Sequence, residues 1–180
     1  ECTRKYVIPY IEQVLPVTPN LRILEIGCGE GGNLKPFLQL GCQCVGVDID
    51  VAQLEKAKQY LSDYSHEEKL TLIARDIYTV TPDEIGTFDI IMLRDVIEHI
   101  PNQERFMHYL KDFMHGESIV FFGFPVWCNP FGGHQQICSN KLLAHMPWLH
   151  LFPNALYKKV LHWGKEKSGT IKGLLEIKAT

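Results

Sequence analysis

The chain has 180 residues, of which 46% are apolar and 22% charged, as in an ordinary globular domain. Its formal net charge of −3 argues against a nucleic-acid surface as the main partner. No run approaches the roughly 18 apolar residues that a membrane-spanning helix needs, and no signal peptide opens the chain. The six cysteines lack the spacing of a secreted disulfide framework, so we expect a reduced, cytoplasmic protein.

Residues 3–15 are predicted to form an N-terminal helix, because apolar side chains recur there at helical spacing. Pro9 is tolerated only near the first turn of such a helix, and Pro16 ends it. The apolar stripe consists of Val7, Ile11, Val14 and Leu15. We therefore expect residues 1–16 to form one helical element ahead of the main fold.

An apolar run, an acid, a glycine cluster and the start of a helical pattern follow one another between residues 21 and 33. The apolar run suits a buried strand of a parallel sheet. The glycines, at positions 27, 29, 31 and 32, allow the backbone to turn tightly and to approach a ligand closely. The helix that follows directs its free N–H groups and the positive end of its dipole towards that ligand. Together these elements predict a nucleotide-type binding site.

Two ligand classes compete for this site. The segment from Gly27 to Gly32 matches the G-x-G-x-x-G dinucleotide fingerprint, and Asp48 follows about 20 residues later, at the end of a second apolar strand. Glu25, however, lies inside the end of the first strand, where a buried carboxylate is costly unless it meets a cation or several donors. A pyrophosphate would repel Glu25, whereas an ammonium group would pair with it. The ligand thus predicted carries an adenine, a ribose and a charged amine.

The stretch from Glu25 to Gly29 resembles the first motif of the class I S-adenosylmethionine (SAM)-dependent methyltransferases, an acid-x-Gly-x-Gly loop. The resemblance implies an α/β, Rossmann-like fold with a doubly wound, mostly parallel sheet and helices on both faces. It also implies SAM as the cofactor and S-adenosylhomocysteine as the product. The residues that we expect around the cofactor at this loop are Glu25, Gly27, Cys28, Gly29 and Asn33.

In the family that the chain resembles, an N-terminal helix often folds over the cofactor. This implies that residues 1–16 act as a lid, in which Arg4 or Tyr6 contacts the cofactor or helps to close the site. The alternative is that both are surface residues.

Residues 41–50 are predicted to contain the second strand, at whose end Asp48 would accept hydrogen bonds from both ribose hydroxyls. Ile49 would cover one face of the adenine. The alternative is that Asp48 is an incidental turn residue. Cys42 and Cys44 alternate along this strand and fit buried core cysteines better than metal ligands.

A helix over residues 50–61, with Asp50 as its N-cap, leads to a third strand over residues 69–74. By the resemblance, the turn after this strand receives the adenine. The Asp76 carboxylate would accept from the exocyclic amine, and the backbone N–H of Ile77 would donate to a ring nitrogen. The alternative is that Asp76 only caps the turn.

The fourth predicted strand, residues 88–93, runs into a Glu-His pair. The stretch over residues 94–101 resembles the fourth-strand motif of the methyltransferase group that includes quinone-biosynthesis and other small-molecule enzymes. The resemblance implies that the backbone at Leu93 and Arg94 lies along the methionine part of SAM. Two roles are open for His99, which either donates to the cofactor or acceptor, or braces the loop.

A helix that starts near Pro101 should pack on the sheet, and residues 118–124 form the fifth predicted strand, apolar on both sides as a central strand requires. Strands and helices thus alternate five times, which predicts a doubly wound sheet with its ligand site at the carboxyl ends of the strands. We expect a single domain over residues 1–180, with the cofactor-binding core at 20–125 and the acceptor loop and C-terminal helices at 126–180.

Residues 125–136 form a loop rich in proline, glycine and aromatic residues, where we expect the acceptor pocket. His134 is the candidate general base, because a neutral imidazole accepts the proton of an attacking hydroxyl near pH 7. The alternative is that His134 only shapes the loop. A zinc site at Cys128, His134 and Cys138 is disfavoured because no fourth ligand suggests itself, and we expect no metal.

The C-terminal part is predicted to be largely helical. Residues 138–150 carry a helical apolar face with Ser139 as the N-cap, and residues 153–163 form a second candidate helix. Class I methyltransferases normally finish with an antiparallel pair of strands, but only residues 174–177 fit a strand here. Either that pair is missing from this chain or the helix predictions near its end are wrong.

These patterns predict an enzyme that transfers a methyl group from SAM to a small-molecule acceptor, with oxygen, nitrogen and carbon acceptors all open. One alternative is an NAD(P)-dependent oxidoreductase, which the G-x-G-x-x-G match favours but which assigns no role to Glu25. The other is a SAM-binding partner or regulatory protein without catalysis. A monomer and a homodimer are both compatible with the sequence.

Overall fold

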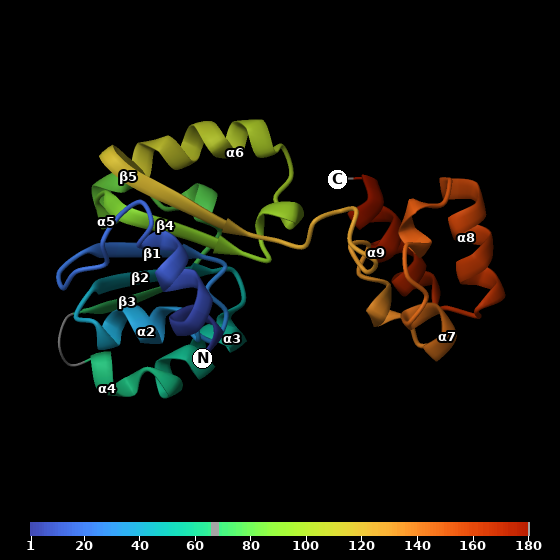
Figure 1. The fold of residues 1–180 in the computed structure, drawn as a ribbon, viewed down its shortest axis with the longest axis horizontal. Helices are drawn as coiled ribbons and strands as arrows, with labels where there is room; N and C mark the ends of the chain where they lie inside the picture. Colours follow the sequence, from blue (N-terminus) through green and yellow to red (C-terminus); the bar gives the residue numbers. More distant parts are fainter. Residues whose placement is uncertain (66–68, 180) are drawn as a thin grey trace. The chain divides into compact units, whose positions relative to one another are not determined.

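The computed structural model describes residues 1–65 and 69–179. The chain divides into two compact units, Glu1–Gly123 and Phe124–Thr180 (Figure 1). The boundary lies close to the change of pattern expected at residue 125, while a single functional domain over the whole chain stays a prediction. None of the helices in the described residues is long and apolar enough to cross a membrane.

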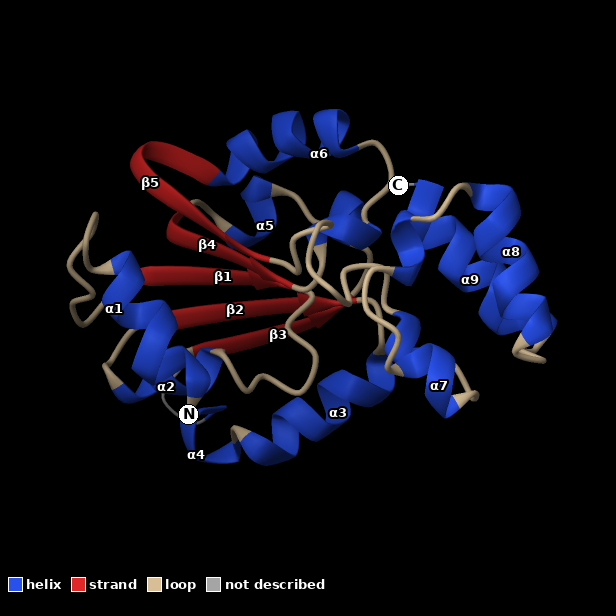
Figure 2. Cartoon of the chain, turned by 45° about the vertical axis from the view of Figure 1, so that its right-hand side comes forward, coloured by secondary structure: helices blue, strands red, loops and turns tan. Residues whose placement is uncertain are grey.

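The first unit contains a sheet of five strands among the described residues, and all of them are parallel (Figure 2). Their spatial order is β3-β2-β1-β4-β5, so the chain moves outward from β1 to β3 and then crosses to the other side of β1. The strands are β1 (Arg22–Ile26), β2 (Gln43–Asp48), β3 (Leu70–Ala74), β4 (Phe88–Arg94) and β5 (Met114–Gly123). The doubly wound parallel sheet predicted from the sequence is confirmed, and its switch point, where open α/β sheets bind ligands, lies between β1 and β4.

Helices cover both faces of this sheet (Figure 2). Successive strand residues face opposite sides, so Ile23 of β1 belongs to one buried cluster and Leu24 to the other. On the Ile23 side lie α1 (Ile8–Ile11), α2 (Leu34–Gln39) and α3 (Val51–Tyr60). On the Leu24 side lie α5 (Pro82–Ile85) and α6 (Gln103–Leu110). Burial on both faces explains why the strands form continuous apolar runs in the sequence.

The N-terminal helix is shorter than predicted. It begins as a π-helix, η1 (Thr3–Val7), and α1 ends at Ile11 rather than at residue 15. Residues 12–14 form turns, in which the N–H groups of Val14 and Leu15 both donate to the Ile11 carbonyl, at 2.9 and 3.0 Å. Val14, which was expected on the apolar face, is therefore 74% exposed.

Side-chain caps mark helix starts in the first unit, among them those of α3 and α5. Asp50 accepts hydrogen bonds from the backbone N–H groups of Ala52 and Gln53 at 2.8 and 3.3 Å, which confirms it as the N-cap of α3. The sequence analysis did not predict α5, which begins with a capping box between Thr81 and Glu84. The remaining helical segments here are α4 (Ser62–Ser65), η2 (Ile77–Thr79), η3 (Ile97–His99) and η4 (Lys111–Phe113).

The fifth strand differs from its prediction in length and in place. It starts at Met114 rather than at residue 118, and it is an edge strand of the described sheet, not a central one. The Ser118 hydroxyl accepts from the His115 N–H at 2.7 Å and donates to the Phe88 carbonyl at 2.6 Å, next to an irregular register with β4. Contact with the helical layers on both faces accounts for its apolar sequence without a second neighbouring strand.

The second unit is helical in the part of the chain that the structure describes. The helix predicted over residues 138–150 is wrong, because only Lys141–Ala144 (α7) is α-helical and Asn140, not Ser139, accepts the capping hydrogen bonds. Pro147 lacks the N–H that a longer helix would need, and Trp148 takes a left-handed φ of 57°.

The helix predicted over residues 153–163 is confirmed as α8 (Asn154–Trp163). Residues 174–177 belong to α9 (Ser168–Ala179), so the described residues contain no final pair of strands. Two short helical turns complete the unit, η5 (Gln135–Ile137) and η6 (Leu149–Leu151).

Candidate functional site

The glycine loop after β1 is fastened to the end of β2. The backbone N–H groups of Gly27 and Cys28 both donate to the Val47 carbonyl, at 2.8 and 3.2 Å. Gly27 has a φ of +71°, which disfavours any side chain, and a Cβ there would collide with the side chain of Val96. Glycine at position 27 is therefore required both by the turn and by close packing of the loop that follows β4.

Asp48 ends β2 and binds the same loop. One carboxylate oxygen accepts from the Gly29 N–H at 2.7 Å, and the other accepts from the Asp50 N–H at 2.8 Å. Each oxygen has a second lone pair, so the carboxylate can still accept from two hydroxyl groups of a ligand. Asp48 is thus held in one orientation at the carboxyl end of β2, the strand next to β1.

An open groove runs along the carboxyl ends of β1, β2 and β3. Its volume is about 780 Å³ when the open solvent at its mouth is included. Six residues expected at the site from the sequence line it: Gly27, Asp48, Ile49, Asp76, Ile77 and His99. Ile49 is 74% exposed beside the Asp48 carboxylate, whereas the Ile77 side chain is buried. A groove with carboxylates at two strand ends and apolar walls suits a nucleoside.

Asp76 serves as a cap in this structure. Its side chain accepts from the Tyr78 N–H at 3.0 Å, and its carbonyl accepts from the Thr79 hydroxyl at 2.7 Å, which starts the turn η2. The capping role therefore exists, and adenine recognition by Asp76 stays a prediction. The neighbouring Arg75 also lines the groove, and its guanidinium pairs with Glu84 at 2.8 Å.

Glu25 is fully buried, as the sequence predicted, and it faces the side of the sheet covered by α1 and α2. Its Oε1 accepts from the Asn33 side-chain amide at 2.7 Å, and its Oε2 has no hydrogen-bond partner among the described residues. Burial raises the pKa of this carboxyl from its ordinary value of 4.5 to about 8, against the opposing effects of the Asn33 hydrogen bond and the Arg94 charge. This buried oxygen can therefore accept a hydrogen bond from a ligand.

Asn33 connects Glu25 with the N-terminal segment and with β4. Its carbonyl oxygen accepts from the Thr3 hydroxyl at 2.6 Å and from Arg94 Nη1 at 2.9 Å. Glu25, Asn33, Thr3 and Arg94 line a small space together with Val7, Met92 and Phe121. Arg94 therefore acts on this region through its side chain, whereas the sequence analysis assigned it only a backbone role.

The remaining candidates of the first unit are placed differently. Tyr6 is 60% exposed and Arg4 is exposed, so the buried residues of η1 are Thr3 and Val7. Leu93 is buried at the end of β4, and Cys28 is buried under the glycine loop. Contact of these residues with a cofactor stays a prediction.

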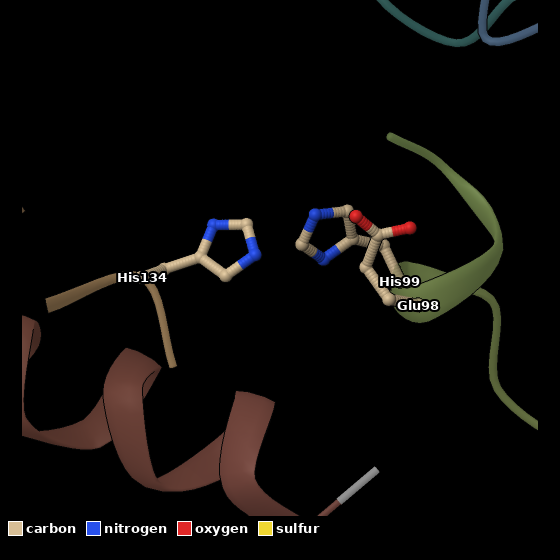
Figure 3. Close-up of side chains that lie close together, drawn as sticks. All are labelled: Glu98, His99 and His134. Atoms are coloured by element: carbon tan, nitrogen blue, oxygen red, sulfur yellow. The ribbon is translucent and has the colours of Figure 1, made fainter. Parts of the chain in front are cut away.

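The two candidate histidines belong to different units. Figure 3 shows the side chains of Glu98 and His99 on the turn η3, and that of His134 on a loop of the second unit. The turn η3 closes with a hydrogen bond from the His99 N–H to the Val96 carbonyl at 2.8 Å. His134 adopts a left-handed φ of 56° before η5. Their catalytic roles stay predictions.

The loop that contains His134 is held by buried polar side chains that the sequence analysis missed. The Gln135 amide donates to the carbonyls of Pro130 and Met146 at 2.8 and 3.1 Å. His150 is fully buried with Nε2 2.6 Å from the Trp127 carbonyl, and Lys178 donates to the His150 carbonyl at 2.6 Å. No local signal identifies such partners, because they come from segments far apart in the sequence.

The cysteines do not form a metal site in the described part of the second unit. Cys128, His134 and Cys138 do not gather their ligand atoms there, and burial raises the pKa of the Cys138 thiol to about 11, which disfavours the thiolate that zinc needs. In the first unit, Cys42 and Cys44 are buried free thiols, as expected from their alternation.

Comparison with known proteins identifies relatives of the first unit. The model of the methyltransferase domain family matches residues 24–117, about half of the chain. The ubiquinone biosynthesis O-methyltransferase of Rhodopseudomonas palustris (strain BisB5) is 38% identical over 90 residues, which cover 48% of this chain and 33% of that protein. The protein of the same name from Bartonella quintana (strain Toulouse) is 33% identical over 104 residues, which cover 57% of this chain and 40% of that protein. The chain thus spans well under half the length of these curated relatives.

Solved structures share the fold. Coclaurine N-methyltransferase, bound to N-methylheliamine and S-adenosylhomocysteine, aligns with a TM-score of 0.57 and 20% identity over 67% of this chain and 35% of that chain. PKMT2 from Rickettsia typhi, in complex with AdoHcy, aligns with a TM-score of 0.57 and 26% identity over 73% of this chain and 26% of that chain. Together with the family match at residues 24–117, these likenesses show that the chain belongs to the methyltransferase domain family, with the class I SAM-dependent methyltransferase fold.

Proposed function

We propose that this chain transfers a methyl group from SAM to a small-molecule acceptor. The observation that carries the proposal is the buried Glu25, whose free oxygen lies at the switch point of the sheet. The carboxylates of Asp48, at the end of β2, and of Asp76, in the turn after β3, line a groove at the same edge of the sheet. The family to which the chain belongs supports the same activity.

The residues fit the chemical groups of this cofactor. Glu25 would pair with the ammonium group, and Asn33 would hold the Glu25 carboxyl in place. Asp48 would accept from the ribose hydroxyls, since its orientation is already fixed by the Gly29 N–H. Ile49 and Ile77 would provide apolar contact for the adenine, and Asp76 would accept from its amine.

The reaction asks little covalent chemistry of the protein, because the sulfonium of SAM supplies an activated methyl group. The chain must hold the two reactants in line and keep water out. Since relatives of the first unit are named O-methyltransferases, we propose a hydroxyl acceptor, whose proton must be taken up as its oxygen attacks. His99 and His134 are the candidates to accept that proton, because a neutral imidazole can act as a general base near pH 7.

Calorimetric titration with S-adenosylhomocysteine and with NAD tests the cofactor. We expect binding of S-adenosylhomocysteine, on the order of micromolar, and none of NAD. The Glu25→Gln variant keeps the shape and removes the negative charge, so it should bind at least about tenfold more weakly, the loss of a charge-assisted hydrogen bond. Binding of NAD alone would overturn the proposal and revive the oxidoreductase alternative.

Turnover separates an enzyme from a SAM-binding protein without catalysis. Formation of S-adenosylhomocysteine from SAM should be measured with a panel of acceptors that carry a hydroxyl group, an amine or an acidic C–H group. Turnover restricted to hydroxyl acceptors is the expected result, and binding of SAM without turnover of any acceptor would favour the regulatory alternative. Three expectations from the sequence stay predictions: that the protein is a monomer or a homodimer, that it is cytoplasmic, and that it does not bind nucleic acid.

A further inference from the structure

Glu25 has no cationic partner within ion-pair distance in the part of the chain that the structure describes. Arg94, whose charge acts on Glu25, directs Nη1 to the Asn33 carbonyl oxygen at 2.9 Å, and its Nη2 lies 3.4 Å from the Cys2 sulfur. The other end of the Asn33 amide donates to Glu25 Oε1 at 2.7 Å. A neutral amide thus stands between the buried carboxyl and the guanidinium of Arg94, whose charge favours its ionisation.

The other groups around Glu25 do not favour its charge. From β2 come Asp48, whose negative charge opposes ionisation, and Cys44; from the glycine loop comes Cys28. Burial raises the pKa of both thiols, so they are neutral. The N-terminal segment contributes an uncharged hydroxyl and an apolar side chain to the same space. A carboxylate without a cation in such surroundings is costly, so the neutral acid is the stable form of the free protein.

We propose that binding of the cofactor expels the proton of Glu25, which changes from a neutral acid in the free protein to the carboxylate partner of the cofactor's ammonium group. The O–H bond of the carboxyl breaks, its proton goes to solvent, and the ammonium keeps its own protons. The free oxygen Oε2, buried and without a partner, is the atom that receives the new hydrogen bond. This inference rests on the proposed function, and it adds the release of one proton to the equilibrium of cofactor binding.

Asn33 is the positioning residue of this arrangement. Thr3 and Arg94 both donate to its carbonyl oxygen, which fixes the amide so that its N–H₂ group faces Glu25. The amide can donate to the neutral acid and to the carboxylate alike, so it holds Glu25 through both states. The two ionisation states therefore share one geometry.

The dependence on pH follows from the pKa of about 8 for Glu25 in the free protein. Above this pH the carboxylate is already formed, so binding removes no proton from Glu25. Below it, each binding event must first remove a proton, so the dissociation constant should rise about tenfold per pH unit as the pH falls. Between about pH 7 and about pH 6 the amine of the ligand stays protonated, so this change reports on the protein alone.

Calorimetry in two buffers of different ionisation enthalpy counts the protons. Titration of S-adenosylhomocysteine at about pH 6 and about pH 7 should release about one proton per site, with about tenfold weaker binding at the lower pH. 5′-Methylthioadenosine, which has the same nucleoside but no amino-acid part, should bind without release of a proton. Binding of S-adenosylhomocysteine with no proton released would overturn this inference and leave the proposed function intact, whereas absence of binding at both values would overturn the proposed function itself.

Two variants assign the proton to its residue. Glu25→Gln should bind S-adenosylhomocysteine with no proton release and no change between the two pH values, while its unchanged affinity for 5′-methylthioadenosine shows that it is folded. Glu30→Gln removes an acid of the same loop that is exposed and pairs with Lys56 at 2.8 Å, so it should behave as the wild type. Release of one proton by Glu25→Gln would mean that another group titrates, and the inference would be wrong.

Discussion

Asn33 shows how a single residue unites distant parts of the chain. It is the N-cap position of α2 but makes no side-chain capping bond, because its amide is used by Glu25, Thr3 and Arg94 instead. The helix start thereby gives up a capping interaction, of the order of 1 kcal/mol, to organise the site. Such an exchange of local stability for placement is expected at functional positions.

Removal of the Thr3 hydroxyl should loosen the N-terminal segment. Thr3→Val keeps the shape, but the hydrogen bond to Asn33 at 2.6 Å is lost, so we expect about 1 kcal/mol less stability in urea unfolding and faster dissociation of S-adenosylhomocysteine. Thr18→Val, at an exposed position, is the matched control and should change neither quantity. Equal dissociation rates for Thr3→Val and the wild type would argue against a lid function of this segment.

Glycine can be required in this loop by a positive φ or by lack of space for a Cβ, and Gly27 and Gly29 differ in the second of these. Both have positive φ, at +71° and +50°, but only at Gly27 would a Cβ meet the side chain of Val96, since the space beside Gly29 is open. We expect Gly29→Ala to lower the free energy of unfolding by about 1 kcal/mol and Gly27→Ala by clearly more. Urea unfolding of the two variants measures the difference. Equal losses of unfolding free energy would show that the Val96 side chain can move aside without an energetic cost.

At the scale of elements, prediction succeeded where the signal is local. The strand, glycine turn and Glu25, the N-cap Asp50 and the strand end at Asp48 each depend on a few consecutive residues. The edge position and early start of β5 depend on strand pairing, which neighbouring residues do not encode. The contacts of Asn33 with Thr3 and Arg94 span 30 and 61 residues, and no periodicity reports on them.

Two misses had signals in the sequence. Thr81 and Glu84 have the spacing of a capping box, which predicts the start of α5. Pro147 argues against a helix that continues to residue 150, because proline interrupts the hydrogen bonds of a helix interior. In both cases a helix terminus was overlooked, and termini are set by single residues that a search for apolar periodicity passes over.

Glu166 should stabilise the start of α7 from a distance. Its two carboxylate oxygens accept from the backbone N–H groups of Ser139 and Asn140 at 3.0 and 2.7 Å, and the residue is buried. Glu166→Ala leaves both donors unsatisfied, so we expect a loss of about 1–3 kcal/mol and faster hydrogen exchange of these two amides. Glu176→Ala, which removes an exposed acid of α9, should change the stability by less than about 0.5 kcal/mol. Unchanged protection of the two amides in Glu166→Ala would contradict this role.

At the scale of the whole molecule, each unit has a core of its own. The second unit is built around residues such as Leu143, Tyr157 and Leu161, which form a buried cluster separate from the two clusters of the sheet. Leu161→Ala should cost about 2–5 kcal/mol because it leaves a cavity at a fully buried position. Hydrogen exchange should show this loss in α8 and α9, with β1 and β4 unchanged. A loss spread equally over both units would mean that they unfold as one.

Folding of the cofactor-free chain should take up a proton at Glu25. The pKa of this carboxyl is about 8 in the fold and near 4.5 in an exposed chain, so the protonated form stabilises the fold fully below about pH 4.5 and its contribution disappears as the pH rises through about 8. Relative to Glu25→Gln, the Tm of the free protein should therefore increase on acidification from about pH 8 to about pH 5. The slope is at most about 1.4 kcal/mol per pH unit.

Saturation with the cofactor should cancel this slope, because the bound fold holds the carboxylate and takes up no proton. The same carboxyl thus makes the stability of the free protein depend on pH and leaves that of the cofactor-bound protein independent of pH over this range.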